Sequence, residues 1–342
     1  MQIKVVKKSN APYYKQIVES VIAAIRTGKA QAGDILPSMN DLADHLDISK
    51  ETVKKAYSIM RNQGYLEARQ GKGFFVAKPG TRRAAQILLL FDVLSPYKEI
   101  MFRSFAARIG DNARPVIRMH NQNVDLLKYY LDEALDKFDY YVITPHFPLD
   151  EETQRKVLKQ LKRVPNRKLI LLDHWMKTLP GSYGAVYQDF ENDICEGLSQ
   201  GIDALRSFAH LNVITLSSSL YHKAIITGIT RFCKEKDIPV RFYTNVTDDI
   251  VRKGEVYLLL NSQLDSQLNQ LVNAAAAKGL EFGRDLSLIS YNDAPFNELI
   301  LGGLTTVSAD FAGMGRMAAE MILNNRPEKV KCAFRMVRRK TF

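Results

Sequence analysis

The first eighty residues place apolar and polar positions in an order that predicts three helices and a hairpin. Apolar residues recur every three or four positions in three segments, a spacing typical of amphipathic helices. Pro12, Ser38 and Ser49 stand where these helices would begin, and proline or a serine cap is favoured there. The inward-facing residues are expected to be Ile17, Val21, Ala24 and Ile25, then Leu42, Ala43 and Leu46, then Val53, Ala56, Tyr57 and Met60. Two short strands, at 65–69 and 74–76, would flank a glycine-containing turn at 70–73.

Beyond residue 85 the pattern changes to short apolar runs that alternate with amphipathic segments. The run Ile87–Phe91 is apolar throughout, which is typical of a strand buried on both faces. Further strands are expected at Val116–Met119, Tyr140–Ile143, Leu169–Leu172, Val213–Leu216, Val240–Tyr243, Val256–Leu260 and Leu286–Ser290. Helices are expected between them, at Ile100–Ile109, Asp125–Leu135, Glu151–Leu161, Asp193–Ser207, Tyr221–Glu235 and Leu264–Lys278. This alternation predicts an α/β fold of doubly wound parallel sheets.

A short polar segment separates the two patterns. Residues 79–84 contain Pro79 and Gly80 and lack an apolar anchor, so we expect a linker with a span of roughly 12–15 Å. The predicted organisation is therefore a small domain at 1–78, a linker at 79–84 and a large domain at 85–342.

Charge distinguishes the two domains. The chain has a formal net charge of +11, but residues 1–84 hold 15 Lys and Arg against 7 Asp and Glu, whereas the other 258 residues hold 33 against 30. This distribution is expected if only the first domain meets a polyanion. Two helices joined by a tight turn, followed by a hairpin with a basic tip, form a typical DNA-reading unit. We therefore predict that the first domain binds double-stranded DNA.

Residues from about Tyr13 to Lys78 resemble the winged helix of the GntR family of bacterial repressors. The resemblance rests on Leu36-Pro37-Ser38, on the segment 48–57, on Gly64-Tyr65-Leu66 and on Gly71-Lys72-Gly73. It implies that DNA is contacted by Ser38, Asn40, Ser49, Lys50, Glu51, Thr52, Lys54, Lys55, Gln70, Gly71 and Lys72. Asn40, Lys50 and Lys54 stand where that family usually has arginine. Lysine offers a point charge instead of a bidentate fork and asparagine suits adenine, so we expect a different operator sequence.

The large domain is similar to the effector domain of the lac-repressor family. The resemblance is carried by 286–293, Leu304–Val307 and Asp310, and extends to 171–173, 186–189 and Gly228. It implies a bilobed fold like that of periplasmic sugar-binding proteins, with two doubly wound parallel sheets. A GntR winged helix joined to such a domain is known among arabinose- and fucose-responsive repressors, and this chain looks like a member of that group.

The resemblance also implies an effector site between the lobes. Parallel sheets bind ligands beyond the carboxyl ends of their strands, where planar polar groups bond sugar hydroxyls and an aromatic ring stacks on the sugar. The candidates that follow predicted strands are Asp92, Ser95, Tyr97, Asp173, His174, Trp175, Asp189, Tyr221, Lys223, Asn261, Asn292 and Asp293. The arginine usual in the helix near Tyr221 is replaced by Ile225 or displaced to Lys223. If Lys223 or His174 points inward, a sugar phosphate fits as well as a sugar.

The expected function is a homodimeric cytoplasmic transcription regulator, a repressor of carbohydrate-use genes controlled by a sugar or sugar phosphate. We expect no signal peptide, membrane contact, metal or cofactor, and the three scattered cysteines, Cys195, Cys233 and Cys332, indicate free thiols. No catalytic motif stands out, so we expect no enzyme. A sugar-active enzyme with an appended DNA-binding head, a plain sugar-binding module and a transcriptional activator are the alternatives.

Overall fold

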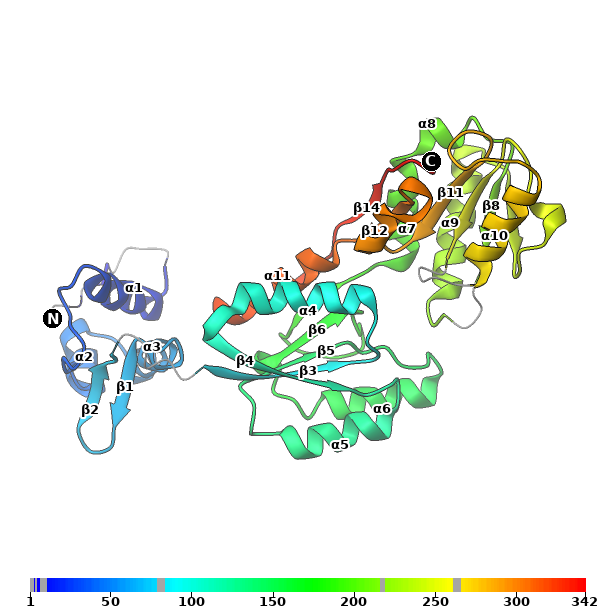
Figure 1. The fold of residues 1–342 in the computed structure, drawn as a ribbon. Helices are drawn as coiled ribbons and strands as arrows, with labels where there is room; N and C mark the ends of the chain where they lie inside the picture. Colours follow the sequence, from blue (N-terminus) through cyan, green and yellow to red (C-terminus); the bar gives the residue numbers. More distant parts are fainter. Residues whose placement is uncertain (1–2, 4, 7–10, 79–83, 216–218, 261–265) are drawn as a thin grey trace. The chain divides into compact units, whose positions relative to one another are not determined.

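A computed structural model describes residues 3, 5–6, 11–78, 84–215, 219–260 and 266–342. The chain forms two compact units, Met1–Ala84 and Ala85–Phe342 (Figure 1). Residues 79–83 of the predicted linker and the candidate Asn261 lie outside the described residues. No helix in the described ranges is long and apolar enough to cross a membrane.

The first unit is a three-helix domain with a hairpin. Its elements are α1 (Tyr13–Arg26), α2 (Met39–Leu46), α3 (Lys50–Asn62), β1 (Leu66–Arg69) and β2 (Gly73–Val76). The strands pair antiparallel, and Ile35 adds an isolated bridge to Phe75. Ile17, Val53 and Tyr57 are fully buried in its core, as the helical spacing predicts.

The second unit begins with a parallel sheet covered on both faces, which we call the first lobe. Its first elements are β3 (Ala85–Phe91), α4 (Pro96–Ile109), β4 (Ala113–Met119), α5 (Val124–Ala134), β5 (Tyr140–Ile143), α6 (Glu151–Leu161), β6 (Leu169–Asp173) and β7 (Gly184–Tyr187). The strand order is β13-β7-β6-β5-β3-β4, and every pair is parallel. Helix α4 covers one face, and α5 and α6 cover the other (Figure 1).

The second lobe repeats this topology. Its elements are α7 (Phe190–Ser199), α8 (Ile202–Leu205), β8 (Leu211–Ile214), α9 (His222–Lys236), β9 (Val240–Tyr243), β10 (Val256–Leu259), α10 (Ser266–Ala277), β11 (Ser287–Tyr291) and β12 (Thr305–Ala309). The order β14-β12-β11-β10-β8-β9 matches that of the first lobe, with β14 as an antiparallel edge. Short 3-10 helices lie at Gly110–Asn112 and Asn166–Lys168 in the first lobe. In the second lobe they lie at Asp248–Ile250, Pro295–Glu298 and Ile300–Gly302. The predicted α/β class with two parallel-dominated sheets is confirmed.

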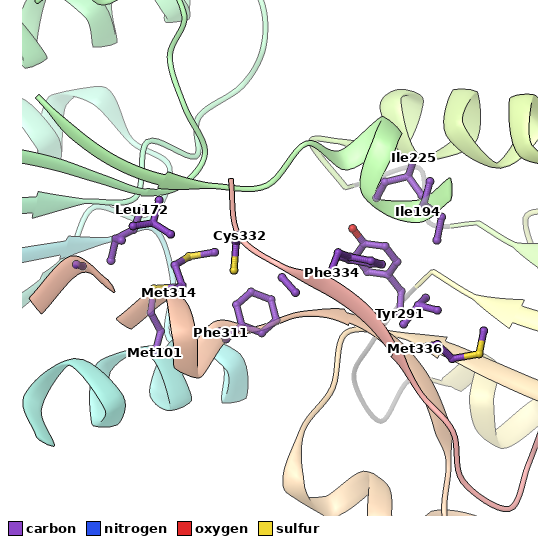
Figure 2. Close-up of a cluster of buried hydrophobic side chains, with 14 of the residues drawn as sticks. Met101, Leu172, Ile194, Ile225, Tyr291, Phe311, Met314, Cys332, Phe334 and Met336 are labelled. Carbon is purple, nitrogen blue, oxygen red and sulfur yellow. The ribbon is translucent and has the colours of Figure 1, made fainter. Parts of the chain in front are cut away.

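The C-terminal segments join the two lobes. After β12 the chain returns to the first lobe as α11 (Phe311–Leu323), which packs on α4, and as β13 (Lys329–Lys331). It then crosses again through Cys332 into β14 (Phe334–Val337) of the second lobe (Figure 2). One hydrophobic cluster runs through this region, from Leu172 and Met314 to Phe334 and Ile225. The lobes therefore share a core at the segments that connect them.

One helix predicted from the sequence is wrong. The segment 193–207 is not a single helix, because α7 ends at Ser199 and α8 begins at Ile202. A Cβ atom on Gly201, between them, would lie 2.8 Å from the flexible end of the Met336 side chain, which would have to shift. Glycine also lowers helix stability by about 1 kcal/mol relative to alanine.

Candidate DNA-contact surface and effector site

The start of α3 presents predicted DNA-contacting side chains to solvent. The Ser49 hydroxyl caps the helix by accepting a bond from the Thr52 backbone N–H at 3.3 Å, and the two hydroxyls lie 2.8 Å apart. Lys50 and Lys54 are exposed, and Lys54 makes an ion pair of 3.2 Å with Glu51. Exposed pairs of this kind contribute about 0–1 kcal/mol, so a DNA phosphate can replace Glu51 at low cost.

The remaining candidates of this domain divide by orientation. Lys55 places its Nζ atom 4.0 Å from the centre of the Tyr14 ring on α1, so it is engaged within the domain. Ser38 caps α2 by accepting from the Asp41 N–H at 3.1 Å, and Asn40 is exposed beside it. At the hairpin tip Gln70, Gly71 and Lys72 are exposed, and Gly71 has a φ of 70°. Glycine adopts this left-handed conformation without strain.

In the first lobe, three charged side chains meet at the ends of β3 and β6. The Lys98 Nζ atom lies 2.6 Å from Asp173 Oδ2 and 3.1 Å from Asp92 Oδ1. Lys98 is only 1% exposed and belongs to the first turn of α4, which the Ser95 hydroxyl caps. Burial would raise the pKa of both carboxyl groups, but the charges of Lys98 and His146, together with hydrogen bonding, lower both pKa values overall. Both aspartates are therefore ionised.

Asp173 has several polar partners besides Lys98. It also accepts bonds from His146 Nε2 at 2.9 Å and from the Gln188 amide. Its backbone has a φ of 71°, a left-handed conformation that is uncommon outside glycine. Burial lowers the pKa of the neighbouring His174 to about 4, with a further contribution from the His146 charge, so His174 is neutral at pH 7.

Aromatic rings from the second lobe lie against this cluster. Tyr221 stacks on Phe190 with ring centres 3.9 Å apart and planes at 9°. The same ring lies 5.2 Å from His146 and 5.1 Å from His174. Burial raises the pKa of Tyr221, and the Asp173 and Asp92 charges add to this. Among the described residues, nothing hydrogen-bonds the buried Tyr221 Oη or Gln188 Oε1.

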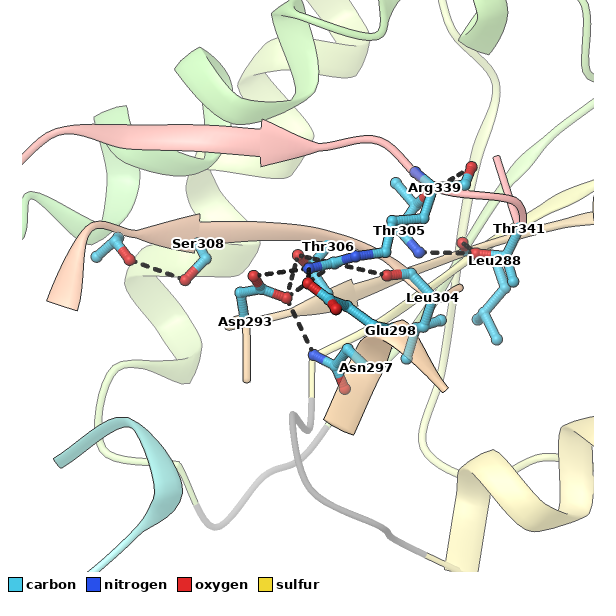
Figure 3. Close-up of polar contacts among 11 residues, drawn as sticks. Leu288, Asp293, Asn297, Glu298, Leu304, Thr305, Thr306, Ser308, Arg339 and Thr341 are labelled. Carbon is cyan, nitrogen blue, oxygen red and sulfur yellow. Dashed lines mark hydrogen bonds and ion pairs between the residues drawn. The ribbon is translucent and has the colours of Figure 1, made fainter. Parts of the chain in front are cut away.

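The two predicted residues after β11 differ in their surroundings. Asp293 is held by Arg339, whose two guanidinium nitrogens lie 2.9 and 3.0 Å from its oxygens, and it accepts from Thr306 at 3.0 Å (Figure 3). Asn292 has a φ of 68°, and its buried Oδ1 has no hydrogen-bond partner within the described ranges. Asn292 thus ends β11 in the conformation that Asp173 has at the end of the corresponding strand β6. Asn292 therefore has a buried acceptor without a partner among the described residues, whereas Arg339 bonds both oxygens of Asp293.

Most of the other candidates for effector binding contact neighbouring side chains. Trp175 donates its indole N–H to Tyr183 Oη at 2.9 Å and packs 4.9 Å from the Tyr187 ring. The Tyr97 ring stacks on Phe311 at 4.9 Å. Asp189 Oδ2 accepts from Asn192 at 2.7 Å near the start of α7. Lys223 is exposed on α9, whereas Ile225 is buried in the shared core.

Sequence reasoning missed Lys98, His146, Gln188 and Phe190. A buried lysine is rare, and the pattern gave no sign that this one faces two carboxylates. His146 follows the predicted strand Tyr140–Ile143 by three residues, so position after a buried strand was the available signal. No cluster of His, Cys, Asp and Glu suited to a metal ion occurs in the part of the chain that the structure describes.

Both units of the chain match known protein families. Residues 13–76 match the gntR family of bacterial regulatory proteins, and residues 206–341 match the periplasmic binding protein-like domain. The transcriptional repressor NagR of Bacillus subtilis is 39% identical over 85 residues, which cover 25% of this chain and 35% of NagR. The arabinose metabolism transcriptional repressor of Geobacillus stearothermophilus is 20% identical, over 93% of this chain and 92% of that protein.

Solved structures show the same fold for the second unit. The dimeric Lac repressor with a C-terminal deletion superposes with a TM-score of 0.57 at 17% identity, covering 75% of this chain and 98% of that one. The chain therefore joins a segment that matches the gntR family to a second unit that has the fold of the Lac repressor and matches the periplasmic binding protein-like domain over residues 206–341.

Proposed function

We propose that this protein is a cytoplasmic transcriptional repressor of carbohydrate-use genes. It binds operator DNA as a homodimer through residues 1–78, and a sugar or sugar phosphate held by residues 85–342 controls that binding. One observation carries the proposal. A single chain joins a gntR-type winged helix with an exposed basic helix start to a bilobed domain whose buried polar cluster leaves ligand-bonding atoms unpaired. Two relatives described as repressors, NagR and the arabinose metabolism repressor, favour repression over activation.

In the DNA-bound state the start of α3 would enter the major groove. Lys50, Thr52 and Lys54 would meet base edges and phosphates, and Asn40 would contact DNA from α2. Gln70, Gly71 and Lys72 at the hairpin tip would reach the adjacent minor groove. A two-fold dimer requires a palindrome whose half-sites lie about 34 Å, or a multiple of it, apart.

The effector would lie at the facing strand ends of the two lobes. Asp92 and Asp173 would accept bonds from sugar hydroxyls, Asn292 and Tyr221 would bond it from the second lobe, and the Tyr221–Phe190 pair would supply an aromatic surface. A ligand that contacts both lobes binds one lobe arrangement more tightly than another. Changing a 99:1 population to 1:99 requires about 5.5 kcal/mol of differential affinity.

Selection of DNA from a random pool by the purified protein tests the DNA half of the proposal. We expect a palindromic consensus, with affinity falling by about 0.9 log unit per log unit of salt for each phosphate contact. A non-palindromic consensus, or binding insensitive to salt, would contradict the proposal. The enzyme alternative predicts that the purified protein turns over a sugar, whereas we expect no turnover.

A further inference from the structure

The charged groups at the candidate effector site are unbalanced. Two ionised carboxylates, Asp92 and Asp173, face one ammonium, Lys98, and the three side chains are almost completely buried. His174 adds no charge at pH 7, since burial lowers its pKa to about 4. His146 and Gln188 donate to Asp173, and the phenols Tyr97 and Tyr221 complete the surroundings. The two aspartates and Lys98 alone carry a formal charge of −1, and His146 is the further basic group bonded to Asp173.

Lys98 cannot serve as a phosphate-binding cation. Its Nζ atom already contacts both carboxylates, and its side chain is 1% exposed. The other basic candidate, Lys223, is exposed on α9. The two undescribed segments that follow β8 and β10, residues 216–218 and 261–265, contain no Lys or Arg in their sequence. Among the described residues, a phosphate beside Asp92 and Asp173 would meet Lys98, which already pairs with both carboxylates, and His146, which is bonded to Asp173.

The carboxylates are suited to hydroxyl donors. Thr144 and Lys98 both contact Asp92 at Oδ1, which leaves Oδ2 to accept from a ligand. Hydrogen bonds to an ionised acceptor are roughly twice as strong as neutral ones, so sugar hydroxyls gain from this arrangement. A like charge placed against the same oxygens is strongly disfavoured.

We propose that Lys98 is a positioning residue that fixes the effector class: it orients Asp92 and Asp173 as ionised acceptors, so the site takes an uncharged or cationic polyhydroxylated ligand and rejects phosphorylated sugars. This inference rests on the proposed function, because it assumes that the bilobed domain binds a carbohydrate. It narrows the choice between sugar and sugar phosphate that the sequence leaves open.

Matched ligand pairs test the ligand class with the full-length protein. Thermal shift and calorimetric titration at pH 7.5 would compare D-ribose, D-glucose and D-glucosamine with D-ribose 5-phosphate, D-glucose 6-phosphate and D-glucosamine 6-phosphate. L-arabinose and L-fucose would be included as further free sugars. We expect a free sugar or amino sugar to bind, with its phosphate at least about 100-fold weaker. Tighter binding of a phosphate than of its parent would overturn the inference while leaving carbohydrate control intact. Binding by neither class would instead count against the proposed function, and the inference would fall with it.

Substitutions test the role of Lys98. Lys98→Met leaves two facing carboxylates, so we expect loss of ligand binding and a drop in melting temperature at pH 7.5 that shrinks as the pH is lowered and the carboxyls protonate. Lys98→Arg should restore part of both. Lys156→Met on α6 is the matched control, because Lys156 is exposed and pairs only at the surface with Glu152.

Asp92→Asn separates selectivity from folding. It removes one negative charge at nearly constant shape, so the ratio of free-sugar to phosphate affinity should fall about tenfold or more. A Lys98→Met protein with wild-type ligand affinity, or one whose loss of stability is the same at all pH values, would show that Lys98 does not organise the carboxylates. An unchanged selectivity ratio in Asp92→Asn would show that charge does not set the ligand class.

Discussion

At the scale of single residues, neighbouring polar side chains have different roles. Asp293 and Asn292 both follow β11, and both are effector candidates by sequence. Arg339 occupies both oxygens of Asp293, whereas Asn292 retains a buried acceptor without a partner among the described residues. Asp293 is therefore expected to stabilise the second lobe, and Asn292 to contact the effector.

Paired substitutions test this division. Arg339→Met should destabilise the protein by about 2 kcal/mol, since it leaves a half-buried carboxylate without its charged partner. Asn292→Ala should change stability little but weaken effector binding about tenfold. Chemical denaturation and titration with the same sugar measure both effects. If Arg339→Met spares stability and abolishes binding, the roles are reversed.

The pH dependence of the Arg339 variant follows from Asp293. Burial would raise its pKa, but the hydrogen bonds and charge of Arg339 lower it overall. A carboxyl with a lowered folded-state pKa contributes stability above its unfolded value of about 3.9, and this contribution is lost as the pH falls below that value. The stability difference between wild type and Arg339→Met should therefore shrink below about pH 4. A difference that stays constant between pH 7 and pH 3 would contradict this account.

Two histidines with lowered pKa values lead to a prediction for stability at acid pH. Burial lowers the pKa of His174 and of His120 to about 4, from about 6.5 in the unfolded chain. The unfolded state then binds more protons, so stability falls as the pH drops from 6.5 towards 4, by up to about 3 kcal/mol for each residue. Denaturation of His174→Gln across this range should give a shallower loss than wild type. Equal slopes would mean that folding does not change the pKa of His174.

At the scale of helices and strands, hydrophobic periodicity predicts the elements that depend on local sequence. The strands β5 and β9 have the predicted bounds, although β5 is a mostly buried apolar run and β9 is a half-buried edge strand that contains Arg241. The sequence did not predict β7, α11, β13 or β14, since Gly184 opens β7, two glycines interrupt α11, and the last strands are defined by partners far away in the chain. The same limit applies to the site. Position after a strand indicated Asp92 and Asp173, but only tertiary structure shows Lys98 between them.

The neighbouring lysines Lys54 and Lys55 of α3 have different partners, so we expect them to contribute differently to DNA binding. Lys54 can exchange its exposed Glu51 partner for a phosphate, whereas Lys55 is engaged by the Tyr14 ring. We expect Lys54→Ala to weaken operator binding and to reduce the salt slope by about 0.9. Lys55→Ala should leave the slope nearly unchanged. Fluorescence anisotropy across a salt series compares the two, and equal slopes would argue against this assignment.

Helix packing in the second lobe depends on Gly228. A Cβ atom at this position of α9 would lie 2.3 Å from the Glu191 carbonyl oxygen of α7. The backbone cannot yield as a flexible side chain can, so Gly228→Ala should destabilise the protein by about 1–3 kcal/mol despite the higher helix propensity of alanine. Thr230→Ala, on the exposed side of α9, is the control. Denaturant midpoints that are equal for the two variants would contradict close packing of α7 and α9.

At the scale of the whole molecule, function depends on coupling within one chain. The two lobes share a hydrophobic core and are joined where α7, α11 and β14 begin, so rearrangement at the strand ends affects the segments that connect them. The cluster of Asp92, Lys98 and Asp173 lies in the first lobe, and Tyr221 reaches it from the second. A ligand bonded by both would favour one arrangement of the lobes.

The affinity of the full chain for its selected operator, measured with and without a saturating sugar, shows whether the bilobed domain controls DNA binding. We expect the sugar to raise the operator Kd by about 5–150-fold, the range of typical coupling free energies. Asp173→Asn should retain operator affinity but lose this response. A sugar that demonstrably binds the protein and leaves the operator Kd unchanged would contradict the central claim that the bilobed domain controls DNA binding.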